Sequence, residues 1–509
     1  MRGEAASLKE LDPSGRLYNE DLAPAAERKW KAYNFFAVWM SSIHNIGTYT
    51  FVAGLFTLGL NGWQVLASIL IGTGILFVGM NWAGKMGQAT GVPFPVMARI
   101  SFGIWGANIP ALIRAVIAIC WYGIQTYLAS MAVVVLLLRI DPDLKRFEEQ
   151  SFLGLSYLGW ACFILLWVLQ LLVITRGMEA VRRFQDWAGP IIWVVMLAMA
   201  VWLFAAAGWN IPMDLSIHPL AGGDAFRGVL TGAFLLVATY ATMLLNYCDF
   251  TRFAKSKRDV VRGNFWGIPV NFAAFAAISI TMTIGTVVVF GDAITDPALI
   301  IAKVPDTTVL IIGALMFIVA TIGVNVVLNF VSPAFDLANV WPKRITFKRG
   351  GLISAVLALL VMPWNLYSNP VVVNYFLGGL GAFLGPLFGI MAADYFLIRK
   401  GIVNIRELYR SDERGEYYYR RGINPRALAV FVPTAAVSAV LALVPAFAAA
   451  APFSWPISVV ASAFAYYFVA RTTTARATAG RTTAGRATVG GSTRAAGDPD
   501  ELAGELSLD

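Results

Sequence analysis

The sequence has little charge. Only 14% of its 509 residues are Asp, Glu, Lys or Arg, whereas soluble domains average about 25%. Apolar residues make up 58% of the chain, and the mean hydropathy is +0.67. These values exclude an ordinary soluble domain and indicate a protein that crosses a membrane several times.

Reactive side chains are also scarce. The chain has two His and three Cys, and Cys120, Cys162 and Cys248 lie in or beside apolar runs without C-x2-C spacing. This pattern excludes a disulfide framework and a zinc site. We find neither an H-E-x-x-H motif nor paired carboxylates within the apolar runs, so the sequence argues against a membrane-embedded enzyme, and we expect no metal or cofactor.

Apolar runs long enough to span a bilayer recur along the chain, and a span needs about 20 residues. We predict an all-α integral membrane protein with twelve transmembrane helices, at 33–56, 62–84, 105–138, 153–174, 187–207, 228–248, 265–291, 308–330, 351–366, 371–397, 427–448 and 453–470. An even number of spans places both termini on one side.

The basic residues indicate which side that is. Most of the 39 Lys and Arg fall in the two tails and the alternate loops facing them; those in the opposite loops are Arg139, Lys145, Arg146, Arg227 and Lys303. By the positive-inside rule both termini are cytoplasmic, in a plasma (inner) membrane protein. The net charge of +9 then reflects topology, and we expect no nucleic-acid partner.

The first span carries the polar stretch SSIHNIGTYT at 41–50. Gly47 weakens a helix there, and unwound backbone at this depth is tolerated only beside a cavity or inside the protein. We predict an interrupted helix with Asn45 facing a ligand. His44 is either a buried neutral histidine bonded to a carbonyl or a functional group.

The third span carries Trp121 and Gln125, which share a helix face at i and i+4. An amide facing lipid would leave its hydrogen-bonding groups unmet, so this face turns into the bundle. A ring and an amide suit a small planar solute, although for this pair taken alone a helix-packing contact is the simpler explanation. Arg114, earlier in this span, either anchors a gate or snorkels to the interface.

The sixth and eighth spans are also polar. The sixth contains Thr239, Tyr240 and Asn246 and ends at Asp249, which we interpret as an ion-pair partner of Arg252 or Lys255. The eighth carries Asn325 and Asn329, again at i and i+4.

If the first ten spans form two repeats of five, the polar interruptions fall in helices one and six and the polar pairs in helices three and eight. Corresponding interrupted segments indicate a transport site near the midplane. This correspondence favours Trp121 and Gln125 as ligand contacts.

The predicted organisation therefore has six parts. They are an N-terminal cytoplasmic tail, a first repeat of helices 1–5, a second repeat of helices 6–10, a cytoplasmic loop, helices 11–12, and a disordered cytoplasmic tail, at 1–32, 33–207, 208–397, 398–426, 427–470 and 471–509 respectively. The last part is rich in Thr, Ala, Arg and Gly with an acidic end, a composition typical of disorder.

Seven stretches resemble the nucleobase:cation symporter-1 family, and especially its allantoin and uracil permease branch within the purine-cytosine permease superfamily. They are LYNEDLAP at 17–24, IHNIGTYT at 43–50, PFPVMARISFGIWGANIPAL at 93–112, WYGIQT at 121–126, MEAVRRFQDWAGP at 178–190, DFTRFA at 249–254 and NFVSPAFDLANVWPKRITFKRGG at 329–351. The resemblance covers about residues 17 to 425. It implies a leucine-transporter-type core of two inverted five-helix repeats followed by two further helices.

The resemblance also implies roles for particular residues. Trp121 would stack on a planar ring and Gln125 would bond its amide edge, with Asn45 and Asn329 as further contacts. The second stacking aromatic, often Trp in the family, is here Tyr240, with Thr239 beside it. A phenol offers less stacking surface than an indole, so uracil, allantoin, hydantoins and cytosine stay unranked as substrates.

The coupling ion is predicted by the same comparison. Sodium-coupled relatives place Ser and Thr hydroxyls on the eighth helix, where this sequence has Gly323 and Val324. The remaining oxygens, near Ser41, His44 and Ala320, are too few for a hard cation. We therefore favour proton coupling, with His44 as the titratable group. The alternatives are a sodium-coupled nucleobase symporter and an amino-acid or amine transporter on the same fold.

Overall fold

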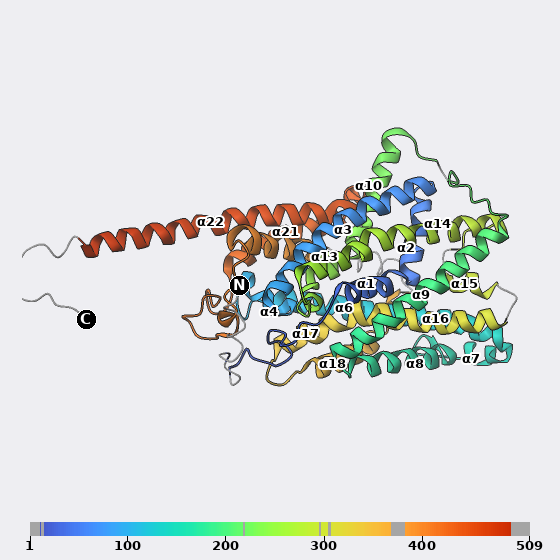
Figure 1. The fold of residues 1–509 in the computed structure, drawn as a ribbon, viewed down its shortest axis with the longest axis horizontal. Helices are drawn as coiled ribbons and strands as arrows, with labels where there is room; N and C mark the ends of the chain where they lie inside the picture. The colour runs from blue at the N-terminus through green and yellow to red at the C-terminus, as the bar shows by residue number, and fades with distance from the viewer. Residues whose placement is uncertain are drawn as a thin grey trace, which may run out of the picture.

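The computed structural model describes residues 11, 15–216, 219–294, 297–303, 307–367 and 382–489. In these residues the chain is helical apart from a two-stranded hairpin, in which β1 (Ser151–Phe152) pairs antiparallel with β2 (Leu155–Ser156). The long helices run side by side along one axis of the molecule (Figure 1). This is the arrangement expected of a membrane bundle, because a helix satisfies its own backbone hydrogen bonds.

Eight helical segments of the described chain are long and apolar enough to cross a membrane, and each coincides with a predicted span. Three of these segments join consecutive elements, described below, and the other five are single helices. The single helices are α3 (Gly62–Thr90), α6 (Asn108–Ile140), α8 (Tyr157–Ile174), α9 (Met178–Ala206) and α21 (Pro425–Leu443).

Two of the other predicted spans are interrupted helices. α1 (Ala32–Ile43) ends at His44, and α2 (Ile46–Thr57) starts after Asn45, whose side chain caps it by accepting from the Thr48 N–H. α10 (Gly222–Thr239) likewise stops at Tyr240, and α11 (Ala241–Asn246) follows. The interruption expected in the first span is therefore confirmed, and the sixth is interrupted at its polar patch.

Two long helical segments contain a π-helical turn just before or around a proline. α13 (Lys257–Phe265) continues through η3 (Trp266–Val270) into α14 (Asn271–Phe290), and α16 (Thr307–Asn325) continues through η4 (Val326–Phe330) into α17 (Val331–Val340). Proline lacks an N–H for the carbonyl four residues earlier. Pro333 thus leaves the Asn329 carbonyl without its helical donor, which explains the wider turn at η4.

The bundle core is formed by contacts between helices far apart in the sequence. α3 packs against α10, α1 against α9 and α13, and α6 against α16 and α17. One hydrophobic cluster of buried side chains runs through most of these contacts. Small residues permit the close approach: a Cβ on Gly72 of α3 would lie 2.8 Å from the Ala233 carbonyl oxygen of α10.

Shorter elements complete the fold. They are α4 (Phe94–Met97), α5 (Arg99–Phe102), η2 (Pro142–Leu144), α7 (Lys145–Glu148), α12 (Cys248–Thr251), α15 (Pro297–Ala302), α18 (Phe347–Leu360), α19 (Pro363–Tyr367), an apolar helix Ala382–Ile398 ending in the π-helical turn η5 (Ala393–Ile398), η6 (Arg406–Tyr409), η7 (Pro445–Phe447) and η8 (Ala451–Phe453). The predicted ninth span corresponds to α18 and α19. Residues 371–381 of the predicted tenth span lie outside the described residues.

The last helix differs from the prediction. α22 (Ser454–Val489) passes the expected end of the span and continues through 471–489, where the composition predicts disorder. In Figure 1 its end projects well beyond the bundle. The continuation is physically reasonable, because a preformed helix removes the nucleation cost and alanine, frequent here, has the highest helix propensity. Residues 490–509 of the predicted tail lie outside the described residues.

Candidate functional site

A small enclosed cavity lies at the interruption between α1 and α2. Side chains from the interrupted helix, α6, α9 and α16 line it: His44, Asn45, Tyr49, Gln125, Leu128, Ala129, Met196, Met316, Ala320 and Thr321. Its volume is about 10 Å³, roughly the room that one water needs. Four of the predicted site residues meet here, and the described conformation is closed around them.

Asn45 lines this cavity but also has a structural role. Its Oδ1 accepts from the Thr48 N–H at 3.1 Å, and its Nδ2 donates to the Ser42 carbonyl at 2.9 Å and the Thr48 hydroxyl at 2.7 Å. The side chain therefore caps α2 and holds the interruption open. Loss of such a cap costs about 0.5–2 kcal/mol.

Gln125 is half-buried and faces the interruption from α6. A Cβ built on Gly47 would lie 3.5 Å from Gln125 Nε2 and 3.2 Å from Asn45 Oδ1, so a larger residue at Gly47 would push into both amides. Within the described chain the Gln125 amide makes no hydrogen bond. Its polar atoms are therefore available in the cavity.

Trp121 is placed differently. It is half-buried against the main hydrophobic cluster one helical turn before Gln125, and it does not line the cavity. The i and i+4 spacing placed both side chains on one face of α6, but the closed cavity reaches only the second of them.

Asn325 and Asn329 form a short chain of amides that joins α16 and η4 to α6. Asn329 Nδ2 donates to Asn325 Oδ1 at 2.9 Å, and Asn325 Nδ2 donates to the Tyr122 carbonyl at 3.2 Å and the Thr126 hydroxyl at 3.0 Å. The polar pairs predicted on the third and eighth helices therefore lie on helices that touch. Asn325 positions Asn329 rather than facing the cavity itself.

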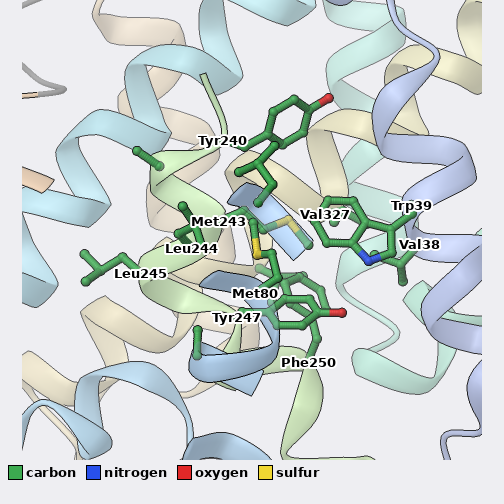
Figure 2. Packing of buried hydrophobic residues seen from close by; sticks show 14 of the residues in the cluster. Val38, Trp39, Met80, Tyr240, Met243, Leu244, Leu245, Tyr247, Phe250 and Val327 are labelled. Atoms are coloured by element: carbon green, nitrogen blue, oxygen red, sulfur yellow. The ribbon is translucent and has the colours of Figure 1, made fainter. Parts of the chain in front are cut away.

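Tyr240 and Thr239 do not lie in the cavity. The Tyr240 ring is buried, 6.3 Å from Trp39 and 5.4 Å from Phe272 between ring centroids, and Figure 2 shows it among apolar side chains of the core. Thr239 is exposed, and its hydroxyl donates to the Leu235 carbonyl at 2.9 Å. At the interruption, two neighbouring residues therefore face in different directions, Tyr240 into the core and Thr239 outward.

His44 lines the cavity within an aromatic environment. Its Nδ1 lies 3.1 Å from the Tyr49 hydroxyl, and the rings of Trp193 and Phe275 have centroids 5.5 and 5.3 Å away. Among the described residues no acidic group bonds the ring. An imidazolium would have no anion to stabilise it here, which favours the buried neutral histidine among the two interpretations.

A residue that the sequence analysis did not single out joins three helices. Gln185 on α9 accepts a hydrogen bond from the Ser41 hydroxyl of α1, and its Nε2 donates to the Gly323 carbonyl of α16 at 3.0 Å. It is fully buried. The uncharged Gln185 amide thus links α1, α9 and α16 at the place where a sodium site was considered. It bonds the Ser41 hydroxyl and the Gly323 carbonyl, two oxygens that face this place.

The buried charged residues correct two interpretations. Asp249 makes no direct hydrogen bond or salt bridge with Arg252, which donates to the carbonyls of Gly91, Asp21 and Ala23 instead. Arg114 does not snorkel, because it is fully buried and donates to the Leu328 carbonyl at 2.8 Å. Two buried carboxylates, Asp249 and Asp336, do share one region, although they are far apart in the sequence.

Comparison with protein families supplies the wider context for this geometry. A family model described as "Permease for cytosine/purines, uracil, thiamine, allantoin" matches residues 23–479. The chain belongs to this permease family. It is therefore an integral membrane transporter rather than an enzyme, as the sequence analysis expected.

Individual proteins agree with this assignment. The permease is 42% identical over 462 residues to the allantoin permease of Bacillus subtilis, covering 90% of this chain and 93% of the relative. It resembles the structure of Mhp1, a nucleobase-cation-symport-1 family transporter in a closed conformation with bromovinylhydantoin bound, with a TM-score of 0.71, 26% identity and coverage of 90% and 96%.

A more distant likeness concerns the fold alone. The structure of MhsT in complex with L-phenylalanine aligns with a TM-score of 0.55 at 14% identity, covering 86% of the permease and all of that chain. The permease therefore shares its overall helical architecture with a protein of distant sequence.

Proposed function

We propose that the permease imports an allantoin-like ureide by alternating access, with uracil and hydantoins as related candidates. The observation that carries this proposal is the free amide of Gln125, which faces the interrupted helix inside a closed cavity. A carboxamide offers one acceptor and two donors, which complements the alternating N–H and C=O groups of a cyclic ureide. The 42% identity to an allantoin permease supports allantoin as the first substrate to test.

The closed cavity has to widen before such a substrate can enter. Widening between α6 and the interrupted helix would bring Trp121, one turn along α6, toward the bound ring, while the amide chain of Asn325 and Asn329 would supply a second polar contact. In this proposal Trp121, Gln125, Asn45 and Asn329 contact substrate. Tyr240 and Thr239 act only through the geometry of the second interrupted helix.

We propose that the driving ion is a proton rather than sodium. Gly323 and Val324 offer no side-chain oxygen, and the Gly323 carbonyl already accepts from Gln185. A sodium ion placed there would have to displace a buried amide whose other end bonds Ser41. The Gln185 amide therefore links α1, α9 and α16 without a cation.

The proposed topology follows the basic residues. Both termini lie in the cytoplasm of a cell whose plasma (inner) membrane holds the permease, and the first ten of twelve spans form two inverted repeats of five. The interruptions at Asn45 and Tyr240 fall at equivalent positions in those repeats, which supports the arrangement.

Uptake by the purified permease in proteoliposomes tests this function. We expect labelled allantoin to accumulate under an inward pH gradient, and accumulation to be unchanged when choline replaces sodium. Unlabelled allantoin, uracil and hydantoin should compete, whereas leucine should not. Competition by leucine alone would reject the ureide assignment, and accumulation that follows a sodium gradient and ignores pH would reject proton coupling.

A further inference from the structure

Three fully buried charged residues meet where α6, α12 and α17 pack together. Arg114 comes from α6, Asp249 from α12 and Asp336 from α17, and the exposed fraction of each is 0%. Asp336 lies one helical turn after Ser332, whose hydroxyl donates to Asp249. Ser332 therefore places the two carboxylates beside the same stretch of α17.

The two carboxylates differ in the number of hydrogen bonds they accept. Asp249 accepts from the Phe94 N–H at 2.8 Å, the Ser332 hydroxyl at 3.1 Å and the Asn246 amide at 3.3 Å. Within the described chain neither oxygen of Asp336 has a hydrogen-bond partner. Asp249 is thus held by three hydrogen-bond donors, whereas Asp336 has no donor in direct contact among the described residues.

Arg114 uses only some of its hydrogen-bond donors. One nitrogen, Nη2, donates to the Leu328 carbonyl at 2.8 Å, while Nε and Nη1 have no partner among the described residues. Arg252, which is also buried, acts electrostatically on Asp249 together with Arg114. A buried ionised carboxylate without a hydrogen-bond partner is very costly, so Asp336 is the carboxylate of this cluster that favours the protonated form.

Other charged groups near α17 are already engaged. Arg99 donates to the Leu408 carbonyl and to Asn339 of α17, Arg252 donates to backbone carbonyls, and Lys348 and Arg349 of the adjacent α18 are exposed. The groups that act electrostatically on Asp336 are Arg114 and Asp249. A proton on Asp336 therefore controls the charge of the cluster.

The cluster is connected to the proposed substrate site. Leu328, whose carbonyl holds Arg114, immediately precedes Asn329 in the π-helical turn η4. Single π-helical turns are often found at functional positions. An ionised Asp336 would attract the unpartnered N–H groups of Arg114, and that movement would pull on the turn that carries Asn329.

We infer that Asp336 is the proton-binding site of transport and that Arg114 is a positioning residue linking its charge to the substrate site. One proton from the external side joins the Asp336 carboxylate, forming an O–H bond, when substrate binds, and it stays there while the permease is closed. The proton leaves to the cytoplasm with substrate release, and the ionised carboxylate then attracts the unpartnered N–H groups of Arg114. This inference rests on proton-coupled transport as proposed above.

The test compares the full-length permease with Asp336→Asn in proteoliposomes. Asparagine imitates the protonated acid but cannot release a proton. For one proton per substrate, a pH gradient of one unit drives about tenfold accumulation of allantoin. We expect wild type to approach this value and Asp336→Asn to show no accumulation, while it still exchanges labelled for unlabelled allantoin at a rate similar to that of wild type.

The matched control is Glu413→Gln, which removes one exposed carboxylate from the cytoplasmic loop and should behave as wild type. Concentrative, pH-driven uptake by Asp336→Asn would overturn the inference. If Asp336→Asn does not insert, Asp336→Glu keeps a titrating group in a shifted position. Its pH profile of uptake should then move from that of wild type, and an unchanged profile would overturn the inference.

A separate measurement tests the role of Arg114. Arg114→Lys keeps the charge but loses the planar fork that can hold the Leu328 carbonyl and a carboxylate together. We expect allantoin affinity to depend less on pH in this variant than in wild type, and an unchanged pH dependence would contradict the role of Arg114. If wild type itself ignores the pH gradient, the proposed proton coupling fails. If wild type responds and Asp336→Asn responds equally, only the assignment of the site fails.

Discussion

The substitution Gln125→Ala separates a substrate contact from a structural one. Because the Gln125 amide makes no hydrogen bond within the described chain, its removal should leave the fold intact. A ureide edge would form two hydrogen bonds with this amide, each contributing about 0.5–1.5 kcal/mol net. The expected loss of binding free energy is then about 1–3 kcal/mol, or roughly 5- to 150-fold in Kd.

Equilibrium binding of labelled allantoin and thermal unfolding, both measured on the purified permease, test this expectation. We expect a higher Kd for Gln125→Ala with a melting temperature near that of wild type. Gln150→Ala is the matched control, since it removes an exposed amide outside the membrane bundle and should change neither quantity. A well-folded Gln125→Ala with the Kd of wild type, or one with a strongly lowered melting temperature, would refute the reasoning.

Three further variants probe the surroundings of the cavity. Asn325→Ala should lower the free energy of unfolding by about 1–3 kcal/mol, because it leaves the Asn329 amide without its buried acceptor and removes the bonds to α6; an unchanged melting temperature would contradict this. Gln185→Leu should destabilise by a similar amount, about 1–3 kcal/mol, because it removes the buried amide that bonds the Ser41 hydroxyl and the Gly323 carbonyl, and uptake that became sodium-dependent would be the unexpected result. Tyr240→Trp should cost about 1–3 kcal/mol through overpacking between Trp39 and Phe272; a thermally neutral variant with altered substrate preference would place Tyr240 in the pocket after all.

Much of the architecture was accessible from local sequence patterns. Apolar runs predict the long helices, and a polar stretch with Gly47 predicts the interruption at Asn45, because both signals depend on neighbours in the chain. The polar pairs on the third and eighth helices were found for the same reason. The assumption of two repeats placed these pairs at equivalent positions, but it did not predict the direct bond between Asn325 and Thr126.

The connections between distant helices were not accessible in this way. Gln185 belongs to the family-like stretch at 178–190 and had no role assigned to it, yet it bonds Ser41 and Gly323, 144 and 138 positions away. Asp249 was assigned to its sequence neighbour Arg252, whereas its real partners include Ser332, 83 residues on. Side-chain direction at an interrupted helix was likewise hidden, so the sequence did not show that Thr239 and Tyr240 lie outside this closed cavity.

The small volume of the cavity has a consequence for measured affinities. A site with room for about one water can accept a ring only by separating α6 and α16 from the interrupted helix, so every observed binding energy is the contact energy minus the work of that separation. The relative affinities for ligands of different size will then depend partly on how easily these helix contacts separate. A variant that loosens the packing far from the ligand should raise the affinity for bulky rings more than for small ones. Selectivity then depends on how easily the helices separate as well as on the chemistry of the residues that line the cavity.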